Sequence, residues 1–290
     1  MIQIINFNDS FASSGFMFNR DNGVSVVKFD AGYPDVRESS DPRSQGHGMV
    51  DYTRFFGARK ISIDFTIYPK WASYETNKQE IIDRLSSFCN PSIRPYIYKR
   101  TDNVDEDRRI MVRSDSLSAP FQFPTIAQAQ MSWIAPSGLW ESAQLFTHDI
   151  YPSYAEQLDI GRSYDLTFDR AYDSRDPSGY LELNVGGTIE SYPGFIIYGP
   201  ATSATIWNRT TGLKMHFPTL TLGVNDSIEI DNLNRSIKLG GQPNVSFYDK
   251  VDWSQSSWIT LATGVNLFSF SAIGNSLSTK LSMAYRHNWI

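Results

Sequence analysis

The sequence predicts a mainly β protein of two domains, with one helix inserted in the first. Short segments rich in β-branched and aromatic residues alternate with turns rich in Gly, Asn and Asp, most clearly from Asn184 to Trp258. Strands separated in this way are typical of β-sandwiches. With 290 residues, of which 41% are hydrophobic and 20% charged, the chain is long and apolar enough to bury two cores.

The charge balance and the cysteine content exclude several classes of protein. The formal net charge is -5, and acidic and basic residues are mixed along the chain. This distribution predicts no sequence-specific nucleic-acid partner, which would need a basic stripe. Cys89 is the sole cysteine, so no intramolecular disulfide forms, and we expect it to be a buried apolar residue. The sequence shows no signal peptide or membrane-spanning run, so we expect no membrane partner and synthesis in a cytosol.

Alternating apolar and polar positions predict the strands of the first domain. In one of them Ile61, Ile63 and Phe65 fall on one face, while Ser62 and Asp64 fall on the other. A strand of this kind is half-buried, with one wet side. The strands predicted in this way are Val24–Phe29, Lys60–Tyr68, Arg94–Lys99 and Arg109–Arg113.

One segment of the first domain has helical spacing instead. Between Ser73 and Cys89, apolar residues such as Ile81, Leu85 and Phe88 recur every three or four positions. Ser73 and Thr76 offer alternative N-caps, and the Asn before Pro91 disfavours helical geometry. The sequence therefore predicts one helix here.

Two polar segments are predicted to be loops. Asp30–Thr53 is long, polar and glycine-bearing, and loops of this length are usually functional or flexible. Asp102–Arg109 is expected to be the solvated tip of a hairpin.

The boundary between the domains is placed near residue 150. The first domain is predicted to close with Gln128–Trp140, and the polar segment Tyr151–Pro177 to contain the crossover. The two predicted domains are therefore 1–150 and 151–290.

The sequence lacks the common catalytic and cofactor motifs. Its four histidines make no zinc pattern, and no nucleophile elbow, phosphate-binding loop or dinucleotide-binding loop occurs. We expect His216 to be a hydrogen-bonded strand residue, and Gly186-Gly187 and Gly240-Gly241 to be hairpin turns. No cofactor, metal or catalytic residue is predicted.

Acidic residues leave two further hypotheses open. Glu229 and Asp231 lie at alternating positions of one predicted strand, and the segment from Asp102 to Asp107 is also acidic. Two carboxylates are what a glycosidase needs, although acidic strand edges more often serve solubility. Asp226 with its neighbours is a weaker pattern for calcium, which takes several oxygen ligands.

Aromatic residues of the second half are candidates for glycan binding. Trp253 lies in a turn-like segment and is expected to be exposed, while Trp207 and Tyr248 are further candidates for stacking on a sugar. The alternative is packing in the core, where aromatic rings bury large areas. We favour this alternative for Trp258.

A pattern of residues across the chain resembles the phage distal tail protein family, also called siphovirus tail component or minor tail protein. In the first half the motif G-x-R-x-I-x-I-x-F precedes the predicted helix, but the corner Ala135–Trp140 lacks the Asp of the family. The N-terminal motif consists of Gly57, Arg59, Ile61, Ile63 and Phe65. The C-terminal pattern consists of Pro193 to Gly199, Asn208, Thr211–Gly212, Asp226 to Asp231, a Trp, and L-x-x-G-x-N-x-F-x-F from Leu261 to Phe270.

The resemblance implies a structural virion protein of a long non-contractile tail tip, made in the bacterial host cytoplasm, and not an enzyme. Family members form hexameric rings through N-terminal domains, and galectin-like C-terminal sandwiches (jelly rolls) project outward. The implied partners are further copies of the chain, the tail tube, tail-tip hub and tape measure proteins, and a receptor-binding protein or fibre. The candidate ring-interface residues are Ile61, Ile63, Phe65, Asp35 and Arg37.

Two other functions stay open at this point. One is a carbohydrate-binding module of a host-receptor-binding tail protein, which would bind a host surface glycan as a monomer. The other is a tail-associated hydrolase, which would lose activity on Glu229→Gln. The sequence does not identify the host or the number of subunits in a ring.

Overall fold

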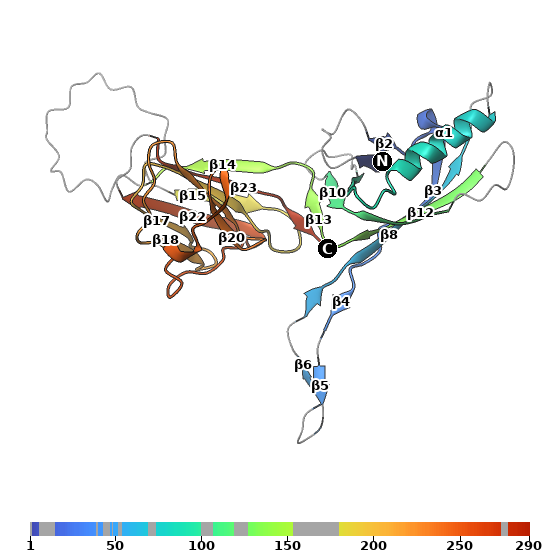
Figure 1. Cartoon of the computed structure of the whole chain (residues 1–290). Helices are drawn as coiled ribbons and strands as arrows, with labels where there is room; N and C mark the ends of the chain where they lie inside the picture. Colours follow the sequence, from blue (N-terminus) through green and yellow to red (C-terminus); the bar gives the residue numbers. More distant parts are fainter. Residues whose placement is uncertain are drawn as a thin grey trace, which may run out of the picture. The chain divides into compact units, whose positions relative to one another are not determined.

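The computed structural model divides the chain into two compact units, and both are mainly β, as predicted (Figure 1). Unit 1 comprises Met1–Gln144 with Trp289–Ile290, and unit 2 comprises Leu145–Asn288. The structure describes residues 2–5, 15–38, 40–42, 47, 49–51, 54–68, 74–99, 107–118, 127–152, 180–273 and 278–290.

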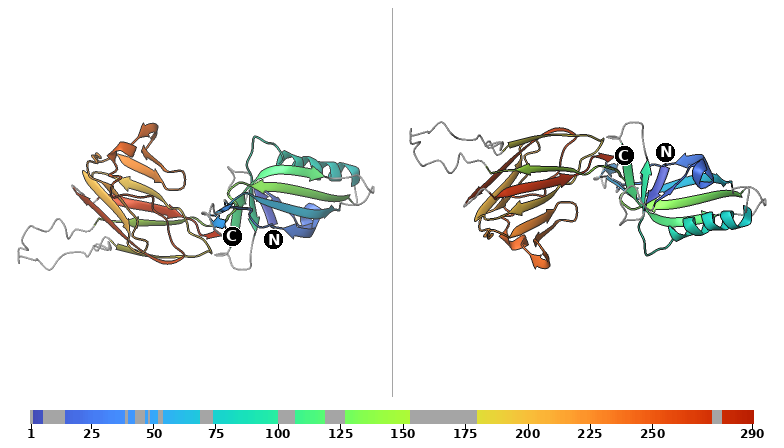
Figure 2. Two further views of the ribbon diagram at one scale, coloured as in Figure 1. Left: turned by 90° about the horizontal axis from the view of Figure 1, so that it is seen from below. Right: turned by 90° about the horizontal axis from the view of Figure 1, so that it is seen from above.

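Unit 1 is built from two antiparallel sheets and the helix α1. The larger sheet has the order β2-β1-β9-β10-β13-β24, and the smaller has the order β11-β12-β8-β3. Figure 2 shows α1 lying along the sheet that contains β8 and β12, and its Leu85 enters the core of the unit. The elements are β1 (Ile2–Ile5), β2 (Phe16–Met17), η1 (Arg20–Asn22), β3 (Val24–Asp30), β8 (Arg59–Ile67), α1 (Tyr74–Ser87), β9 (Tyr96–Lys99), β10 (Arg108–Met111), β11 (Arg113–Ser118), β12 (Ala127–Ala135), β13 (Trp140–Ser142) and β24 (Asn288–Trp289).

Strand β8 is the centre of the smaller sheet, and this position corrects part of the predicted ring interface. Ile61 and Ile63 are 0% exposed and Phe65 is 1% exposed, because they face the core of unit 1. The strand is also paired on both edges, with β12 and with β3. Neither these side chains nor a free strand edge is left for a second subunit. The predicted alternation of the strand is confirmed, but the contact role of its apolar face is wrong.

The segment predicted as a long polar loop contains a two-stranded arm. Strand β4 (Val36–Arg37) pairs with β7 (Phe55–Phe56), and β5 (Ser40–Pro42) pairs with β6 (Met49–Asp51). In Figure 1 this ribbon projects away from the two sheets of unit 1. The loop prediction was wrong because the strands are very short and polar, so they show no apolar periodicity.

The other predictions for unit 1 are largely confirmed. The predicted helix corresponds to α1, although Cys89 just beyond it is half-buried and not fully buried. Strands β9 and β10 form the expected hairpin, in which Lys99 lies opposite Arg108. Arg108 and Arg109 therefore belong to a strand and not to the hairpin tip, whose residues 100–106 lie outside the described part of the chain.

Unit 2 is a sandwich of two antiparallel sheets. One has the order β14-β23-β16-β19-β20-β21, the other β15-β22-β17-β18. Their inward residues form one core, in which the rings of Phe195 and Phe268, one from each sheet, lie 6.1 Å apart. Residues 153–179 of the predicted crossover lie outside the described residues. The elements are β14 (Phe146–Ile150), β15 (Tyr180–Val185), β16 (Gly194–Tyr198), β17 (Ser203–Asn208), β18 (Lys214–Phe217), β19 (Ser227–Asp231), β20 (Ser236–Leu239), β21 (Gln242–Ser246), η4 (Tyr248–Lys250), β22 (Gly264–Ile273) and β23 (Lys280–Tyr285).

A buried pair of asparagines accounts for two positions of the C-terminal sequence pattern. Asn208 and Asn266 are both 0% exposed, and Nδ2 of Asn208 donates to Oδ1 of Asn266 at 3.1 Å. Asn208 also donates to the carbonyl of Thr260, and Asn266 exchanges two hydrogen bonds with the backbone of Ala262. Because a buried amide must be hydrogen-bonded, these side chains fix the turns around them.

The two double-glycine segments have different roles. Gly240-Gly241 joins β20 to β21 with a φ of 72° at Gly241, so this hairpin prediction is confirmed. Gly187 instead lies against Asn288, and a Cβ atom there would stand 2.1 Å from the Asn288 carbonyl oxygen. Gly186-Gly187 is therefore a site of close backbone contact, and its prediction as a hairpin turn was wrong.

Candidate functional site

The arm of unit 1 (residues 36–56) leaves the sheets through a tightly packed base. The amide of Gly57 donates to the carbonyl of Asp35 at 2.5 Å, and the amide of Asp35 donates to the carbonyl of Ala58 at 3.0 Å. A Cβ atom at position 57 would lie 3.1 Å from the Asp35 carbonyl oxygen and 3.6 Å from Cγ of Arg37. The first residue of the G-x-R motif is therefore a glycine because the two strands of the arm meet there.

The arginine of the same motif attaches this base to the corner that follows β12. Arg59 is 3% exposed, and its Nε donates to the carbonyl of Gly138 at 2.9 Å. Gly138 has a φ of 68°, and a Cβ atom there would lie 2.2 Å from the Gly57 carbonyl oxygen. Burial lowers the pKa of Arg59 from its ordinary value, but a guanidinium keeps its charge in proteins. The motif therefore positions the arm, and its role is structural.

A groove lies beside the base of the arm. Its volume is about 500 Å³, and three of its lining residues are exposed arginines from separate elements, Arg37, Arg94 and Arg113. Asp35 is the single acidic side chain that lines it. Two of the predicted ring-interface residues, Asp35 and Arg37, thus lie together in a site of mainly positive charge. The remaining lining residues are Gly57, Ala58, Ile134 and Pro136.

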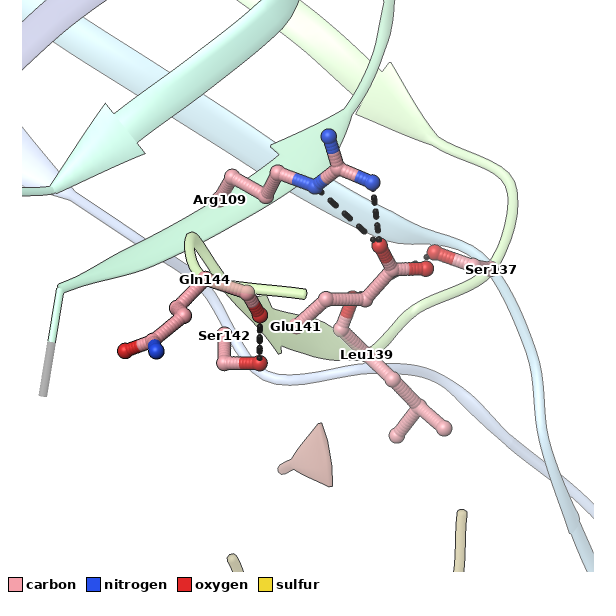
Figure 3. A network of polar contacts seen from close by, with 6 residues as sticks. All are labelled: Arg109, Ser137, Leu139, Glu141, Ser142 and Gln144. Carbon is pink, nitrogen blue, oxygen red and sulfur yellow. Dashed lines mark hydrogen bonds and ion pairs between the residues drawn. The ribbon is translucent and has the colours of Figure 1, made fainter. Parts of the chain in front are cut away.

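A second polar network lies where the chain leaves unit 1 (Figure 3). Nε and Nη2 of Arg109 donate to Oε2 of Glu141 at 3.3 and 3.2 Å, which joins β10 to β13. The same guanidinium lies 4.3 Å from the ring centroid of Tyr96. The hydroxyl of Ser142 donates to the carbonyl of Gln144 at 2.8 Å. The Arg109–Glu141 pair holds β13 against β10, and the bond from Ser142 stabilises the turn that follows β13.

The structure brings together two of the three aromatic residues predicted to bind glycans. The rings of Trp253 and Tyr248 stack at 4.5 Å, and Nε1 of Trp253 donates to the Tyr248 carbonyl at 3.0 Å. Trp253 is half-buried against the core, so the expectation of an exposed ring was wrong for it, whereas Tyr248 is 45% exposed. Trp258, expected in the core, is also half-buried and lies 5.4 Å from Trp253.

Trp207, the third candidate, lies on the outer face of β17. The guanidinium of Arg209 covers its ring at 4.3 Å and lies 5.0 Å from the ring of Tyr180. Nε of Arg209 also donates to the hydroxyl of Ser269 at 3.1 Å. One face of the Trp207 ring is therefore occupied by an arginine of its own chain, which leaves less aromatic surface for a sugar.

The acidic candidates of unit 2 have structural contacts. Asp231 accepts hydrogen bonds from the amide and the side chain of Asn234, and Asp226 accepts one from the amide of Gly223, so both stabilise turns. Glu229 lies opposite Lys238 on β20, beside a hollow of about 610 Å³ on the outer face of the sheet. Among the residues that the structure describes, no cluster of three or more metal-ligating side chains occurs.

His216 also has a structural contact in unit 2. Its Nδ1 lies 2.8 Å from the hydroxyl of Thr205, so the prediction of a hydrogen-bonded strand histidine is confirmed.

Comparison with known proteins relates unit 2 to phage tails. Residues 186–289 match the family model described as siphovirus-type tail component, C-terminal domain. Unit 2 belongs to the siphovirus-type tail components. The predicted resemblance is confirmed, and the matched region contains the asparagine pair described above. No curated protein matches the chain.

Solved structures extend the likeness in fold to the whole length of the chain. The crystal structure of SPP1 Dit, described as a paradigm of the hub adsorption apparatus in phages that infect Gram-positive bacteria, is similar with a TM-score of 0.65 and 10% identity. That likeness covers 100% of both chains. A chain of the phage P2 baseplate in its activated conformation with calcium is similar with a TM-score of 0.51 and 12% identity, over 99% of this chain and 97% of that one. The likeness in fold to these two structures therefore covers both units. Within the described residues, no helix is long and apolar enough to cross a membrane.

Proposed function

We propose that this tail component is a hub protein of the tail tip that assembles into a hexameric ring through unit 1. The observation that supports this proposal best is the arm, whose base is packed and hydrogen-bonded at Gly57, Arg59 and Gly138. A structural role of this kind requires no catalytic residues. Ring partners would include the tail tube, hub and tape measure proteins, while unit 2 would carry the receptor-binding protein or fibre.

The composition of the arm favours a contact with another subunit. Val36 and Phe55 are 46% and 62% exposed, and Tyr33 beside the base is 66% exposed. An isolated two-stranded ribbon is marginally stable in water, so a neighbouring surface would stabilise it. A head-to-tail contact, in which an arm meets a different surface of the next copy, closes into a ring. We therefore place the interface at the arm and its base, with Asp35 and Arg37, and not at β8.

Deletion of the arm tests this proposal. Because the Gly57 amide is bonded to the Asp35 carbonyl, a Gly-Ser link can replace residues 36–56 without moving the sheets. Light scattering across a concentration series should give the intact chain a mass near six times 32.9 kDa and the deleted chain the monomer mass. Circular dichroism serves as the control that both units stay folded.

The tail tube protein distinguishes the remaining outcomes. If the intact chain is monomeric alone, it should form the ring when the tail tube protein is added. An assembly that forms equally well without the arm, or no assembly with the tail tube protein, would contradict the proposed interface.

A further inference from the structure

The groove at the base of the arm contains three arginines that no side chain of the described residues pairs with. Arg37 is on β4, Arg94 precedes β9 and Arg113 begins β11, so three separate segments each contribute an arginine to the lining of one groove. Among the described residues, none of the three forms an ion pair or hydrogen bond through its side chain. Like charges that line one groove favour the entry of an anion.

The acidic residues near the groove are mostly engaged elsewhere. Glu38 is paired with Arg54 at 3.3 Å. Asp115 interacts electrostatically with Arg113, but its ion pair is with Lys60, at 3.1 Å. Asp35 lines the groove, but it is a single carboxylate against three guanidinium groups. The site therefore keeps a surplus of positive charge.

We propose that this groove binds an acidic segment of a neighbouring protein subunit, with two or more carboxylates on Arg37, Arg94 and Arg113. Planar guanidinium groups suit carboxylates because they donate two parallel hydrogen bonds. The groove, at about 500 Å³, has the size of a ligand-binding cleft. This inference rests on the proposed function, because it gives the chemistry of the partner surface at the proposed subunit interface.

The lining of the groove favours a protein partner over a nucleic acid. Ile134 and Pro136 offer apolar surface to the stem of a Glu or Asp side chain, whereas a phosphate backbone would leave them unused.

Binding of a labelled hexaglutamate peptide to the full chain tests the inference. Fluorescence anisotropy is measured at protein concentrations where light scattering gives the monomer mass, with hexaglutamine as the neutral control. The peptide should bind, and raising NaCl from about 50 to about 200 mM should weaken it through screening. Arg37→Gln, Arg94→Gln and Arg113→Gln should each weaken it about 3- to 10-fold. Arg20→Gln, an exposed arginine of η1 outside the groove, is the matched control and should leave it unchanged.

One variant is expected to improve binding, which loss of folding cannot imitate. Asp35→Asn removes the one acidic side chain of the groove but keeps the backbone bonds to Gly57 and Ala58. It should tighten hexaglutamate binding about 2- to 5-fold. Weaker binding of Asp35→Asn, an equal loss in Arg20→Gln, or equally tight binding of a single-stranded DNA oligonucleotide or inorganic phosphate would overturn the inference.

The same samples separate this inference from the proposed ring. If the ring assembles but hexaglutamate does not bind the monomer, the inference fails and the ring proposal stands. If hexaglutamate binds through the three arginines and no ring forms with or without the tail tube protein, the ring proposal fails and the groove remains a site for acidic protein segments.

Discussion

Arg59 and Gly138 are 79 residues apart in sequence, yet Nε of Arg59 donates to the Gly138 carbonyl at 2.9 Å inside unit 1. This bond connects the first residue of β8 with the corner after β12. The corner in turn lies against Gly57, from which the arm departs. One buried guanidinium therefore fixes the direction in which the arm leaves the sheets.

Removing this guanidinium should destabilise unit 1. Arg59→Ala removes a buried hydrogen bond and the packing of the aliphatic stem, and we expect a loss of about 2 to 3 kcal/mol in the free energy of unfolding. Lys60→Ala is the matched control, because Lys60 is exposed and its ion pair with Asp115 contributes less than about 1 kcal/mol. Denaturant unfolding of both variants checks the difference. An equal effect of the two substitutions would contradict the anchoring role of Arg59.

Two glycine substitutions should separate backbone strain from steric clash. Gly138 and Gly212 both have positive φ, at 68° and 76°, but a Cβ atom clashes with the Gly57 carbonyl in the first and meets nothing within 4 Å in the second. Gly212→Ala should cost about 1 kcal/mol through strain alone, and Gly138→Ala clearly more. Thermal unfolding of the two variants measures the difference. Similar losses of stability would show that the corner around Gly138 rearranges to accept a Cβ atom.

The asparagine pair of unit 2 should behave as one unit. Asn208→Ala and Asn266→Ala each leave buried partners unsatisfied, which costs about 1 to 3 kcal/mol. The double variant should lose less than the sum, because the bond between them is removed only once. Asn184→Ala, at an exposed position of β15, is the control. Additive losses in a double-mutant cycle would exclude direct coupling.

His287 should make the stability of unit 2 depend on pH. Its ring stacks on Phe146 at 4.3 Å, and burial lowers its pKa below the ordinary value of 6.5. The unfolded chain then binds the proton more readily, so the free energy of unfolding should fall as the pH drops below 6.5. His287→Gln should reduce this slope, whereas His47→Gln in the exposed arm should not. Urea unfolding at a series of pH values from neutral to mildly acidic gives the slopes, and an unchanged slope in His287→Gln would refute the assignment.

Glycan binding by unit 2 would depend on Tyr248, since Trp253 is half-buried against the core. Tyr248→Ala should leave the core intact because the ring is 45% exposed, whereas Trp253→Ala should destabilise unit 2 by about 2 kcal/mol or more. If the aromatic pair binds sugar, a glycan array with the full chain shows signals that Tyr248→Ala abolishes. For the proposed hub role we expect no such signals, and saturable binding of a glycan would support the alternative.

Local patterns in the sequence were sufficient for the longer strands, the helix and the resemblance to the family. The alternation around Ile61 and the helical spacing around Leu85 reflect which face each segment buries, and that is a local property. The turn residues near Asn208 likewise encode the resemblance that the match over residues 186–289 confirms.

The arm, the groove and the true role of β8 were decided by tertiary structure. The strands of the arm are too short and polar to show a period, and Ile61 looks the same in sequence whether it faces a core or a second subunit. Arg37, Arg94 and Arg113 are separated by 76 positions from first to last and have no common motif. They meet because β4, the segment before β9 and the start of β11 all line the groove, and such a meeting depends on the register of the sheets, which no single segment encodes.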